Sequence, residues 1–575
     1  MTYTPPVAEQ RYLLRHVVKF DELVGQSGYA DATPDLVDAI LEGAGQFAAG
    51  EFAPLNRVGD TVGAKWSPGG VTMPPGFKEA YRAYVDAGWG TLAGPAEYGG
   101  QGLPLTLATV VMEDLGSANM AFSLIMMLTP GTVEALKHHG SAELQRTWLP
   151  KLVTGEWSGT MNLTEPQAGS DVGALRTSAV PRGDGTYSIK GQKIFITFGE
   201  HDLADNIVHL VLARLPDAPA GTRGISLFLV PKFRLHADGA LGTHNDVRCV
   251  SIEHKLGIHA SPTCVMSYGD NDSCIGWLVG KENGGMRAMF TMMNNARLNV
   301  GLQGVSMAER ATQAAVAYAR ERVQSARAGR AGREPVAIIE HPDVRRMLLR
   351  MKALSQAARA LTYYTAGLTD RATLGSEDAQ SRADLLTPLV KAYGTDIGVE
   401  VASLGVQIHG GMGYVEETGA AQHYRDARIA PIYEGTNGIQ AADLVGRKLG
   451  LEGGAVLERL LNDMRSDASG HPLLMELIDA CGAVAAKLAE SNIDDRLAAS
   501  YPFLTMLSVA VSGWLMALQL AAAEQADADP DFLRMKIAAA RFYLEQVVPE
   551  ALGLSAAAMA PADLLYRISE ENFAA

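Results

Sequence analysis

Apolar and polar positions alternate in different ways along the chain, and the first pattern is helical. Residues 31–150 contain long apolar runs, such as LTLATVVMEDLGSANMAFSLIMML at 105–128, and charges recur at helical spacing from Lys137 to Trp148. Glycine pairs and prolines punctuate these runs. The pattern predicts a set of helices over this region.

A second pattern begins near residue 157. Residues 186–197, 206–215 and 224–233 are short runs rich in β-branched and aromatic residues, separated by turns that contain Gly, Asp or Pro. Such runs predict the strands of an antiparallel β domain.

The helical pattern returns near residue 284. Apolar residues then recur every three or four positions and predict one long amphipathic helix; they are Leu386, Val390, Tyr393, Ile397, Val401, Leu404 and Ile408. The polar stretch 369–382 predicts a loop. The glycine-rich 451–455 predicts a linker to a further Ala- and Leu-rich helical domain.

We therefore expect an α+β protein that is mainly α. The predicted parts are an N-terminal extension (1–34), an N-terminal helical domain (35–156), a β domain (157–283), a helical bundle (284–450) and an extra C-terminal helical domain (455–575).

Composition restricts the function classes. A chain of 575 residues is too long for one core, and a formal charge of −15 gives no support to nucleic-acid binding, which needs a basic face. The four cysteines show no C-x-x-C spacing, and the N-terminus has no signal-peptide pattern. We expect reduced thiols in a cytoplasmic protein.

Residues 497–523 carry no charge and are long enough to span a bilayer. However, Thr505, Ser508, Ser512 and Gln519 fall within roughly 60° on a helical wheel, and much of the remainder is alanine. We expect a buried helix of a soluble bundle and no membrane span.

Familiar nucleotide and metal motifs are missing from the sequence. It contains no G-x-x-x-x-G-K-[ST], no G-x-G-x-x-G between a strand and a helix, and no H-E-x-x-H, so we expect no metal site. HGGMG (409–413) follows a helix, where glycines form an ordinary C-cap.

Two stretches in the sheet region offer groups to a flat heterocycle. MNLTEPQAGSD (161–171) places small and hydroxyl residues in a turn, and KIFITFGEH (193–201) places Phe195 and Thr197 on one face of a strand. Taken alone, the first stretch could be just a turn, and for the second an ordinary strand pair packed on a core is the more common case.

Two further stretches lie in the later helical region. ARERVQSARAG (319–329) gathers arginines where a helix ends, which suits a pyrophosphate or simply a solvated helix end. In RIAPIYEGTNGIQ (428–440) Glu434 has apolar neighbours and should be partly desolvated, as a general base requires, although a loop glutamate is the other reading.

Together these four stretches resemble the acyl-CoA dehydrogenase family over roughly residues 35–450. LTEPQAGSD resembles the family signature that meets flavin and substrate, with Gln167 in place of the usual small residue, and IYEGT resembles the signature that carries the base. GVQIHGGMGY (405–414) resembles the segment that reaches the FAD pyrophosphate of a neighbouring subunit.

The resemblance implies roles for particular residues. Glu434 would be the base, and Ser170, Arg297, Tyr433 and Gly435 would meet the substrate. FAD would be bound by Met161, Leu163, Thr164, Phe195, Thr197, Arg322, Gln324, Gln407, Gly411, Thr436 and Asn437. Gln324 stands where threonine is common. Ala296 stands where some members carry their base, so Glu434 has no competitor there.

The extra C-terminal domain, YTPPVAEQRYLL (3–14) and two later segments, 253–269 and 282–298, resemble the family's long subgroup of 3-methylmercaptopropionyl-CoA dehydrogenases. The implied reaction is FAD-dependent conversion of an acyl-CoA to the trans-2-enoyl-CoA, by a homodimer with electron-transferring flavoprotein as acceptor. The substrate would be 3-methylmercaptopropionyl-CoA or a short or medium straight-chain acyl-CoA. Alternatives are an acyl-CoA oxidase and a non-catalytic, DNA-associated relative.

Overall fold

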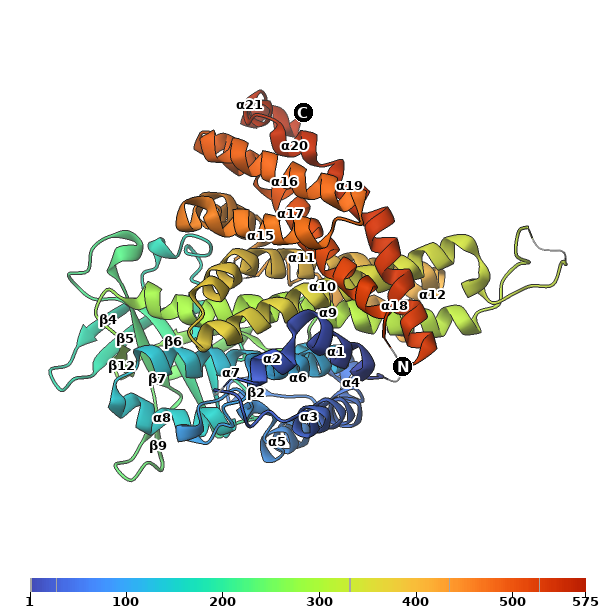
Figure 1. Cartoon of the computed structure of the whole chain (residues 1–575). Helices are drawn as coiled ribbons and strands as arrows, with labels where there is room; N and C mark the ends of the chain where they lie inside the picture. Colours follow the sequence, from blue (N-terminus) through green and yellow to red (C-terminus); the bar gives the residue numbers. More distant parts are fainter. Residues whose placement is uncertain (1–2, 27, 330–331, 434, 527) are drawn as a thin grey trace. The chain divides into compact units, whose positions relative to one another are not determined.

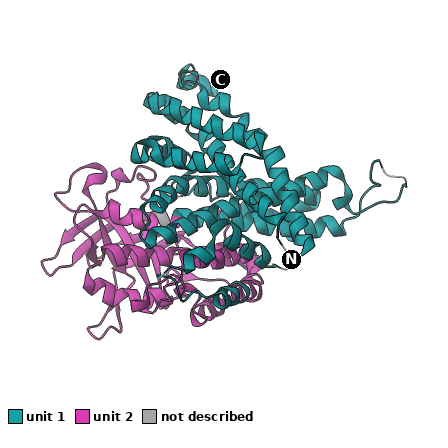
Figure 2. Cartoon of the chain, in the orientation of Figure 1, with its two compact units in different colours: residues 1, 3–42, 297–575 teal, residues 2, 43–296 magenta. Residues whose placement is uncertain are grey.

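The computed structural model describes residues 3–26, 28–329, 332–433, 435–526 and 528–575. They form two compact units (Figure 2). Unit 1 contains residues 3–42 and 297–575, and unit 2 contains residues 43–296. This division is coarser than the domains expected from the sequence, so their boundaries stay a prediction.

Unit 2 begins with the helices that the apolar pattern predicts. They include α3 (Pro34–Phe47), which starts in unit 1, α4 (Leu55–Val62), α5 (Phe77–Asp86), α6 (Leu105–Ala118), α7 (Met120–His139) and α8 (Ala142–Thr154) (Figure 1). The apolar run at 105–128 divides at Asn119, whose side chain accepts a hydrogen bond from the backbone N of Phe122 and caps α7. Nearly all of α7 is buried, and it packs against the first strand of the sheet.

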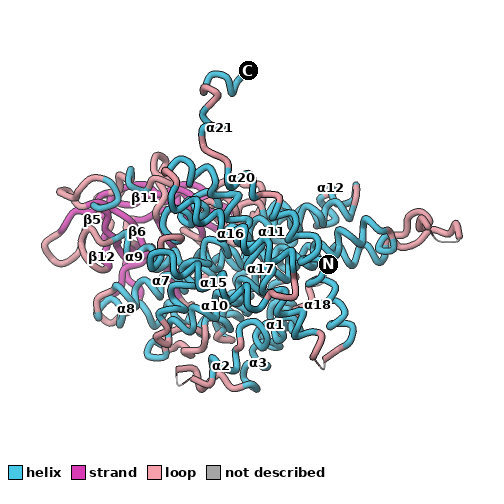
Figure 3. Tube along the Cα trace, turned by 45° about the horizontal axis from the view of Figure 1, so that its top comes forward, coloured by secondary structure: helices cyan, strands magenta, loops and turns pink. Residues whose placement is uncertain are grey.

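All strands named here lie in unit 2 (magenta in Figure 3). Two small hairpins pair β1 (Lys65–Ser67) with β2 (Gly70–Thr72) and β8 (Phe233–Leu235) with β9 (Leu241–His244). The main sheet has the order β10-β11-β5-β12-β7-β6-β3, and β4 pairs with β5 and β6. Its strands are β3 (Trp157–Asn162), β4 (Ser178–Pro181), β5 (Tyr187–Thr197), β6 (Asn206–Arg214), β7 (Ile225–Pro231), β10 (Val247–Ile252), β11 (Thr263–Tyr268) and β12 (Ile275–Val279).

The sheet differs from the predicted antiparallel sheet at one edge. β3 pairs with β6 in parallel register, from Trp157 opposite Asn206 to Asn162 opposite Val211. A parallel pair needs a long crossover, and residues 163–205, which include β4 and β5, provide it. Apart from a single parallel pairing of Ser178 on β4 with Arg214 on β6, the other strand pairs of the main sheet are antiparallel, so the expectation was right for most of the sheet.

Two histidines are buried beside the parallel edge. Nε2 of His201 lies 2.9 Å from Oγ of Ser158, and Nδ1 of His209 lies 2.9 Å from Oγ1 of Thr160. Burial, with the Lys232 cation adding to it, lowers the pKa of each imidazole to about 3. Both histidines are therefore neutral parts of the folded core.

Long helices form the centre of unit 1. They are α9 (Gly285–Glu321), whose first residues belong to unit 2, α10 (Pro342–Thr373) and α11 (Glu377–His409). Shorter helices follow: α12 (Gly411–Tyr414), α13 (Ala420–Ala427) and α14 (Asn437–Asp443). The long amphipathic helix predicted from Leu386 to Ile408 is confirmed as part of α11, and Gly410 ends it with a φ of 60°.

The prediction of a loop at 369–382 is wrong, because only residues 374–376 separate α10 from α11. Ser376 accepts a hydrogen bond from the backbone N of Ala379 and caps α11. The polar residues that follow lie on the helix surface, where Arg382 pairs with Asp378 at 2.8 Å and with Asp463 at 2.6 Å. Polarity here marks an exposed helix face and not a loop.

Glycines let α9 and α11 cross closely. A methyl group built on Gly304 of α9 would lie 1.9 Å from the carbonyl O of Gly394 on α11, and one built on Gly394 would lie 2.6 Å from the carbonyl O of Gly301. No larger side chain fits at this crossing unless the helices separate. The close approach fixes the two helices that carry Arg297 and Lys391.

The C-terminal helices of unit 1 follow a break at Glu452 to Gly454, where the backbone has positive φ angles. They are α15 (Ala455–Asp467), α16 (Pro472–Glu490), α17 (Ile493–Ala523), α18 (Pro530–Phe542), α19 (Val548–Leu552), α20 (Ser555–Met559) and α21 (Asp563–Tyr566). Among the described residues, α17 alone is long and apolar enough to cross a membrane, but 89% of its apolar window is buried inside the protein. It agrees with the predicted buried helix.

The N-terminal segment of unit 1, with α1 (Val7–Leu13) and α2 (Phe20–Val24), binds the C-terminal helices. Glu9 Oε1 accepts a hydrogen bond from the buried Nζ of Lys536 at 2.8 Å, and the hydroxyl of Tyr12 donates to the carbonyl O of Gln519 at 2.7 Å. The predicted N-terminal extension is thus an integral part of this helical unit.

Candidate active site

In unit 2 the stretch 161–171 begins at the end of β3 and continues into a turn, and Glu165 fixes the shape of this turn. The buried carboxylate accepts hydrogen bonds from the backbone N of Arg176 at 2.7 Å and of Thr177 at 3.0 Å. It also accepts one from Oγ1 of Thr177 at 2.6 Å and pairs with Nζ of Lys193 at 2.8 Å. Burial favours the neutral acid, but Lys193 and these donors prevail and lower the pKa of Glu165 to about 2.

The same region joins two predicted stretches. Nζ of Lys193, on β5, donates to the carbonyl O of Leu163 at 3.0 Å, and the backbone N of Ile194 donates to the carbonyl O of Thr164 at 2.9 Å. Residues 161–171 and 193–201 therefore lie against each other, although about 30 positions separate them in the sequence.

A bulge in β5 turns Phe195 outward. Ile196 pairs with Cys264 and Lys193 pairs with Met266, so two residues of β5 face one residue of β11. Phe195 has a φ of 60° and is 58% exposed. The other predicted residues of this surface differ: Met161, Thr164 and Thr197 are partly exposed, Leu163 is buried and Ser170 is exposed.

In unit 1 the loop of residues 431–438, called the base loop below, ends at the start of α14. The predicted base, Glu434, lies outside the described residues. The hydroxyl of its neighbour Tyr433 donates to Oε1 of Gln303 on α9. Gly435 has a φ of 73°, and its carbonyl accepts a hydrogen bond from Nε2 of Gln440 at 3.0 Å. A methyl group on Gly435 would lie 2.6 Å from that same Nε2, so this position requires glycine.

Asn437 ties the base loop to α11. Its Oδ1 accepts a hydrogen bond from Nζ of Lys391 at 2.8 Å. Its Nδ2 donates to Oδ1 of Asp396 at 2.8 Å, to Oγ1 of Thr395 at 3.0 Å and to the carbonyl O of Ala392 at 3.2 Å. Burial lowers the pKa of Lys391 to about 7, although Asp396 opposes this shift. Both polar groups of the Asn437 side chain therefore face α11.

Arg297 places a buried cation beside the base loop. A methyl group built on Gly435 would lie 3.7 Å from its Nε, and one guanidinium nitrogen of Arg297 lies 3.7 Å from Oδ2 of Asp443. Thr436, at the start of α14, caps this helix because its Oγ1 accepts a hydrogen bond from the backbone N of Ile439 at 3.2 Å. A cation in this position favours negative charge on nearby groups.

The residues predicted for the pyrophosphate also lie in unit 1, and all four are exposed: Arg322, Gln324, Gln407 and Gly411. The rings of Tyr318 on α9 and His409 on α11 stack with centroids 4.4 Å apart, which brings the ends of the two helices together. Arg322 donates to Oε1 of Gln324 at 3.1 Å. Exposed guanidinium and amide donors suit a diphosphate.

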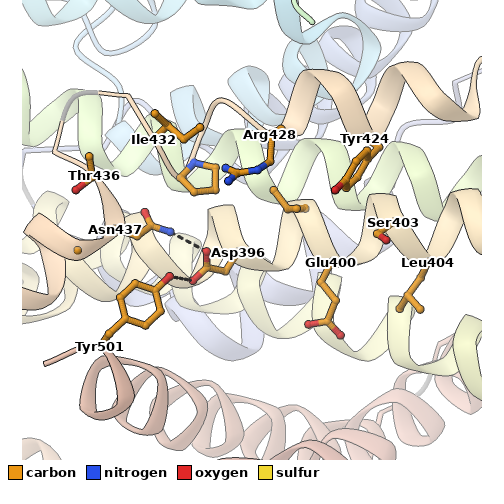
Figure 4. Close-up of a pocket in the computed structure, with 13 residues that line it drawn as sticks. Asp396, Glu400, Ser403, Leu404, Tyr424, Arg428, Ile432, Thr436, Asn437 and Tyr501 are labelled. Carbon is orange, nitrogen blue, oxygen red and sulfur yellow. Dashed lines mark hydrogen bonds between the residues drawn. The ribbon is translucent and has the colours of Figure 1, made fainter. Parts of the chain in front are cut away.

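An open pocket of about 670 Å³ adjoins the base loop (Figure 4). Its lining comes from α11, α13, the base loop and α17: Asp396, Val399, Glu400, Ser403, Leu404, Tyr424, Arg428, Pro431, Ile432, Thr436, Asn437, Gly438 and Tyr501. The hydroxyl of Tyr501 donates to Oδ2 of Asp396 at 2.6 Å. Burial raises the pKa of Asp396, whereas its bonds with Tyr501 and Asn437 act in the opposite direction.

Sequence reasoning missed the residues that hold these segments. Glu165 stood within the quoted signature without a role, and Lys391 and Asp396, which lie between the apolar positions of the predicted amphipathic helix, were not singled out. Their signal was a lysine followed five residues later by an aspartate inside a run that is otherwise largely apolar. Tyr501 gave no signal, because only the fold brings it to α11.

Four domain families match the chain. "Acyl-CoA dehydrogenase, N-terminal domain" matches residues 37–156, the corresponding middle domain matches 160–270 and the C-terminal domain matches 283–450. "Acetyl-CoA dehydrogenase C-terminal like" matches residues 472–569.

Curated relatives match along nearly the whole length. The 3-methylmercaptopropionyl-CoA dehydrogenase of Ruegeria pomeroyi is 48% identical, with 96% of this chain and 97% of the relative covered. A butyryl-CoA dehydrogenase of Syntrophomonas wolfei is 36% identical, with 94% of each covered.

Solved structures share the fold. An acyl-CoA dehydrogenase from Bacillus anthracis, complexed with FAD, has a TM-score of 0.75 at 22% identity and covers 93% of this chain and 90% of its own. A chain from a study of the electron transferring flavoprotein of Acidaminococcus fermentans has a TM-score of 0.59 at 27% identity, covering 72% of this chain and 97% of its own.

Proposed function

The chain belongs to the acyl-CoA dehydrogenase family, and we propose that Glu434 is its catalytic base and 3-methylmercaptopropionyl-CoA its preferred substrate. As a member of this family it is an FAD-dependent enzyme that converts an acyl-CoA thioester to the enoyl-CoA. The observation that carries the substrate proposal is the 48% identity to the Ruegeria pomeroyi enzyme, which extends through the C-terminal helical domain. A short or medium straight-chain acyl-CoA is the second candidate, since a butyryl-CoA dehydrogenase also matches the full length.

The described residues fit FAD in chemistry. In unit 2 the exposed ring of Phe195 and the partly exposed hydroxyls of Thr164 and Thr197 suit a flat, hydrogen-bonding ring system. In unit 1 the exposed Arg322 and Gln324, with Gln407 and Gly411, suit a diphosphate. When bound, FAD supplies the acceptor for the hydride from the substrate's β-carbon.

The protein's own part in the reaction is proton removal. In this proposal the Glu434 carboxylate takes the α-proton of the thioester as the β-hydride leaves, so that a carbon–carbon double bond forms and the enoyl-CoA carries no added charge. Backbone N–H donors at the thioester carbonyl must stabilise the enolate character, since a carboxylate alone is too weak a base for this proton. The Glu434 proton must leave before the next turnover.

Neighbouring groups support this role. The buried Arg297 cation lies beside Gly435. In this proposal it would favour ionisation of the Glu434 carboxylate, because an opposite charge stabilises the charged form. Tyr433, bound to Gln303, and Asn437, bound to Lys391, hold the loop on either side of position 434. By the same family resemblance, Ser170 of unit 2 would meet the pantetheine arm of the substrate.

We also propose that electron-transferring flavoprotein reoxidises the enzyme and that the enzyme is a homodimer. The first follows the family's redox partner, and the second rests on the exposed positions of Arg322, Gln407 and Gly411, which suit a pyrophosphate held by a neighbouring subunit. An oxidase would instead transfer electrons directly to O₂. Comparison of reoxidation rates in air and with electron-transferring flavoprotein separates the two, and sedimentation determines the subunit number.

A substrate panel tests the proposed specificity. The purified holoenzyme is mixed anaerobically with 3-methylmercaptopropionyl-CoA, butyryl-CoA, octanoyl-CoA or palmitoyl-CoA, and loss of flavin absorbance is followed in a stopped-flow instrument. We expect 3-methylmercaptopropionyl-CoA to give the highest ratio of rate to half-saturating concentration. Reduction by palmitoyl-CoA alone would contradict the proposal.

A further inference from the structure

A chain of hydrogen bonds connects the C-terminal helical domain to the base loop. Tyr501 lies on α17, and its hydroxyl donates to Oδ2 of Asp396 on α11 at 2.6 Å. The other carboxylate oxygen of Asp396 accepts from Nδ2 of Asn437 at 2.8 Å (Figure 4). Three separate helices, α17, α11 and α14, thus meet through two bonds to one carboxylate.

Asn437 passes this restraint to the loop backbone. Its backbone N donates to the carbonyl O of Pro431 at 3.0 Å, so the residue closes the loop from Pro431 to its own position. Its side chain cannot rotate without losing the ammonium of Lys391 on one side and the carboxylate of Asp396 on the other. The orientation of Asn437 therefore restrains this residue and Pro431, the two described residues that the backbone bond joins and that lie on either side of position 434 in the sequence.

Tyr501 acts on this hydrogen-bond chain through Asp396, whose orientation and pKa depend on the bond from the Tyr501 hydroxyl. The charged and titratable groups that act on it are Lys391 on its own helix, Arg428 after α13 and the Tyr501 hydroxyl on α17. Glu400 of α11 lines the same pocket, but its carboxylate pairs with Arg350. Burial favours its neutral acid, and the hydrogen bonds from Tyr501 and Asn437 favour its ionised form. Removal of the Tyr501 bond frees one carboxylate oxygen and shifts the pKa of Asp396 upward.

We propose that Tyr501 is a positioning residue for the base loop, through which the C-terminal helical domain contributes to catalysis. The proposal rests on the proposed role of Glu434 as the base. Loss of the hydroxyl lets Asp396 turn away or take up a proton, and Asn437 then loses its partner on α11. The loop holds its base less accurately, and this slows proton removal without weakening substrate binding.

The test compares two tyrosines of one pocket. Tyr501 and Tyr424 both line it and are 39% and 38% exposed. Among the described residues the Tyr501 hydroxyl has a hydrogen-bond partner, Asp396, and the Tyr424 hydroxyl has none. We expect Tyr501→Phe to lower kcat about tenfold, since a misplacement of about 1 Å can cost up to 10²-fold. KM, bound FAD and Tm should stay near wild-type values, and the acidic limb of the kcat profile should move to higher pH. Tyr424→Phe should match wild type throughout.

Each outcome has a defined meaning. Unchanged kcat in Tyr501→Phe, or an equal fall in Tyr424→Phe, overturns the inference. If Tyr501→Phe gives too little folded protein, Asp396→Asn carries the test, because it removes the same carboxylate and keeps the phenol ring; unchanged kcat there overturns the inference as well. If Glu434→Gln is inactive while Tyr501→Phe is fully active, only this inference fails. An active Glu434→Gln enzyme refutes the proposed function itself.

Discussion

Replacement of Glu165 by Gln should destabilise unit 2 and loosen the turn at 161–171. The carboxylate is buried with Lys193, which has no exposed surface, and it accepts hydrogen bonds from Arg176, Thr177 and Gln167. Glutamine has the same shape as glutamate, but its NH₂ group can only donate, and every partner of the Glu165 carboxylate is itself a donor. One oxygen now accepts from the backbone N of Arg176 and Nε2 of Gln167, and these two bonds would be lost if the amide oxygen stays with Lys193.

The expected cost follows from burial. Removal of one partner from a buried ion pair costs about 3–5 kcal/mol, because the other charge stays in a poorly solvated site. Glutamine still offers Lys193 one acceptor oxygen, so we expect the lower limit, about 3 kcal/mol. For a unit of this size 1 kcal/mol shifts Tm by about 2–4 °C, which gives a fall of about 6–12 °C.

The assay is thermal unfolding of the holoenzyme, followed by circular dichroism, with FAD content measured in parallel. Glu156→Gln is the matched control, because Glu156 pairs with Lys151 at the surface, where the two side chains are 41% and 46% exposed. Such exposed pairs contribute about 1 kcal/mol or less. Equal falls in Tm for the two variants would refute the reasoning that burial gives Glu165 its importance.

Three further predictions follow. His209 stays neutral in the folded protein, with a pKa of about 3, while in the unfolded chain it takes up a proton below about pH 6.5. The free energy of unfolding should therefore fall by up to about 1.4 kcal/mol per pH unit below that pH. His209→Gln should flatten this fall when unfolding is measured by urea titration. Gly435→Ala should lower kcat, because the added methyl group meets Gln440 and the backbone φ of 73° disfavours alanine. Gly446→Ala, which has open space around the added methyl group, should leave kcat unchanged. Equal kcat values for the two variants would exclude strain at Gly435. Lys536→Met should lower the free energy of unfolding of unit 1 by about 3 kcal/mol, because Glu9 loses its buried cation. The double variant with Glu9→Gln should lose less stability than the sum of the two single variants. Additive losses would contradict this pairing.

Periodicity predicted most elements because each buries one continuous apolar face. The alternation of residues 186–197 and 206–215 became β5 and β6, and the repeat from Leu386 to Ile408 became part of α11. Residues 369–382 were misread because a polar helix surface and a loop have similar composition. The parallel pairing of β3 with β6 depends on where the chain returns after a long crossover, which local pattern does not determine.

Short motifs predicted the residues of the site, but the sequence did not predict the residues that hold these motifs in place. The stretches around Glu165 and Gly435 were found because their residues are close in sequence. The partners that fix them, such as Lys193 for Glu165 and Tyr501 for Asp396, are 28 and 105 positions away. Such pairs need the fold to be recognised, since each residue alone is an ordinary lysine or tyrosine.

The most direct test of the account is single-turnover reduction of the Glu434→Gln holoenzyme by 3-methylmercaptopropionyl-CoA in a stopped-flow instrument. Glu417→Gln, which changes an exposed carboxylate of the same unit, serves as the control. We expect Glu434→Gln to bind FAD and keep the oxidised flavin spectrum, while flavin reduction slows by at least about 10²-fold, the contribution of a positioned base. Reduction within tenfold of the Glu417→Gln rate would contradict the assignment of Glu434 as the base.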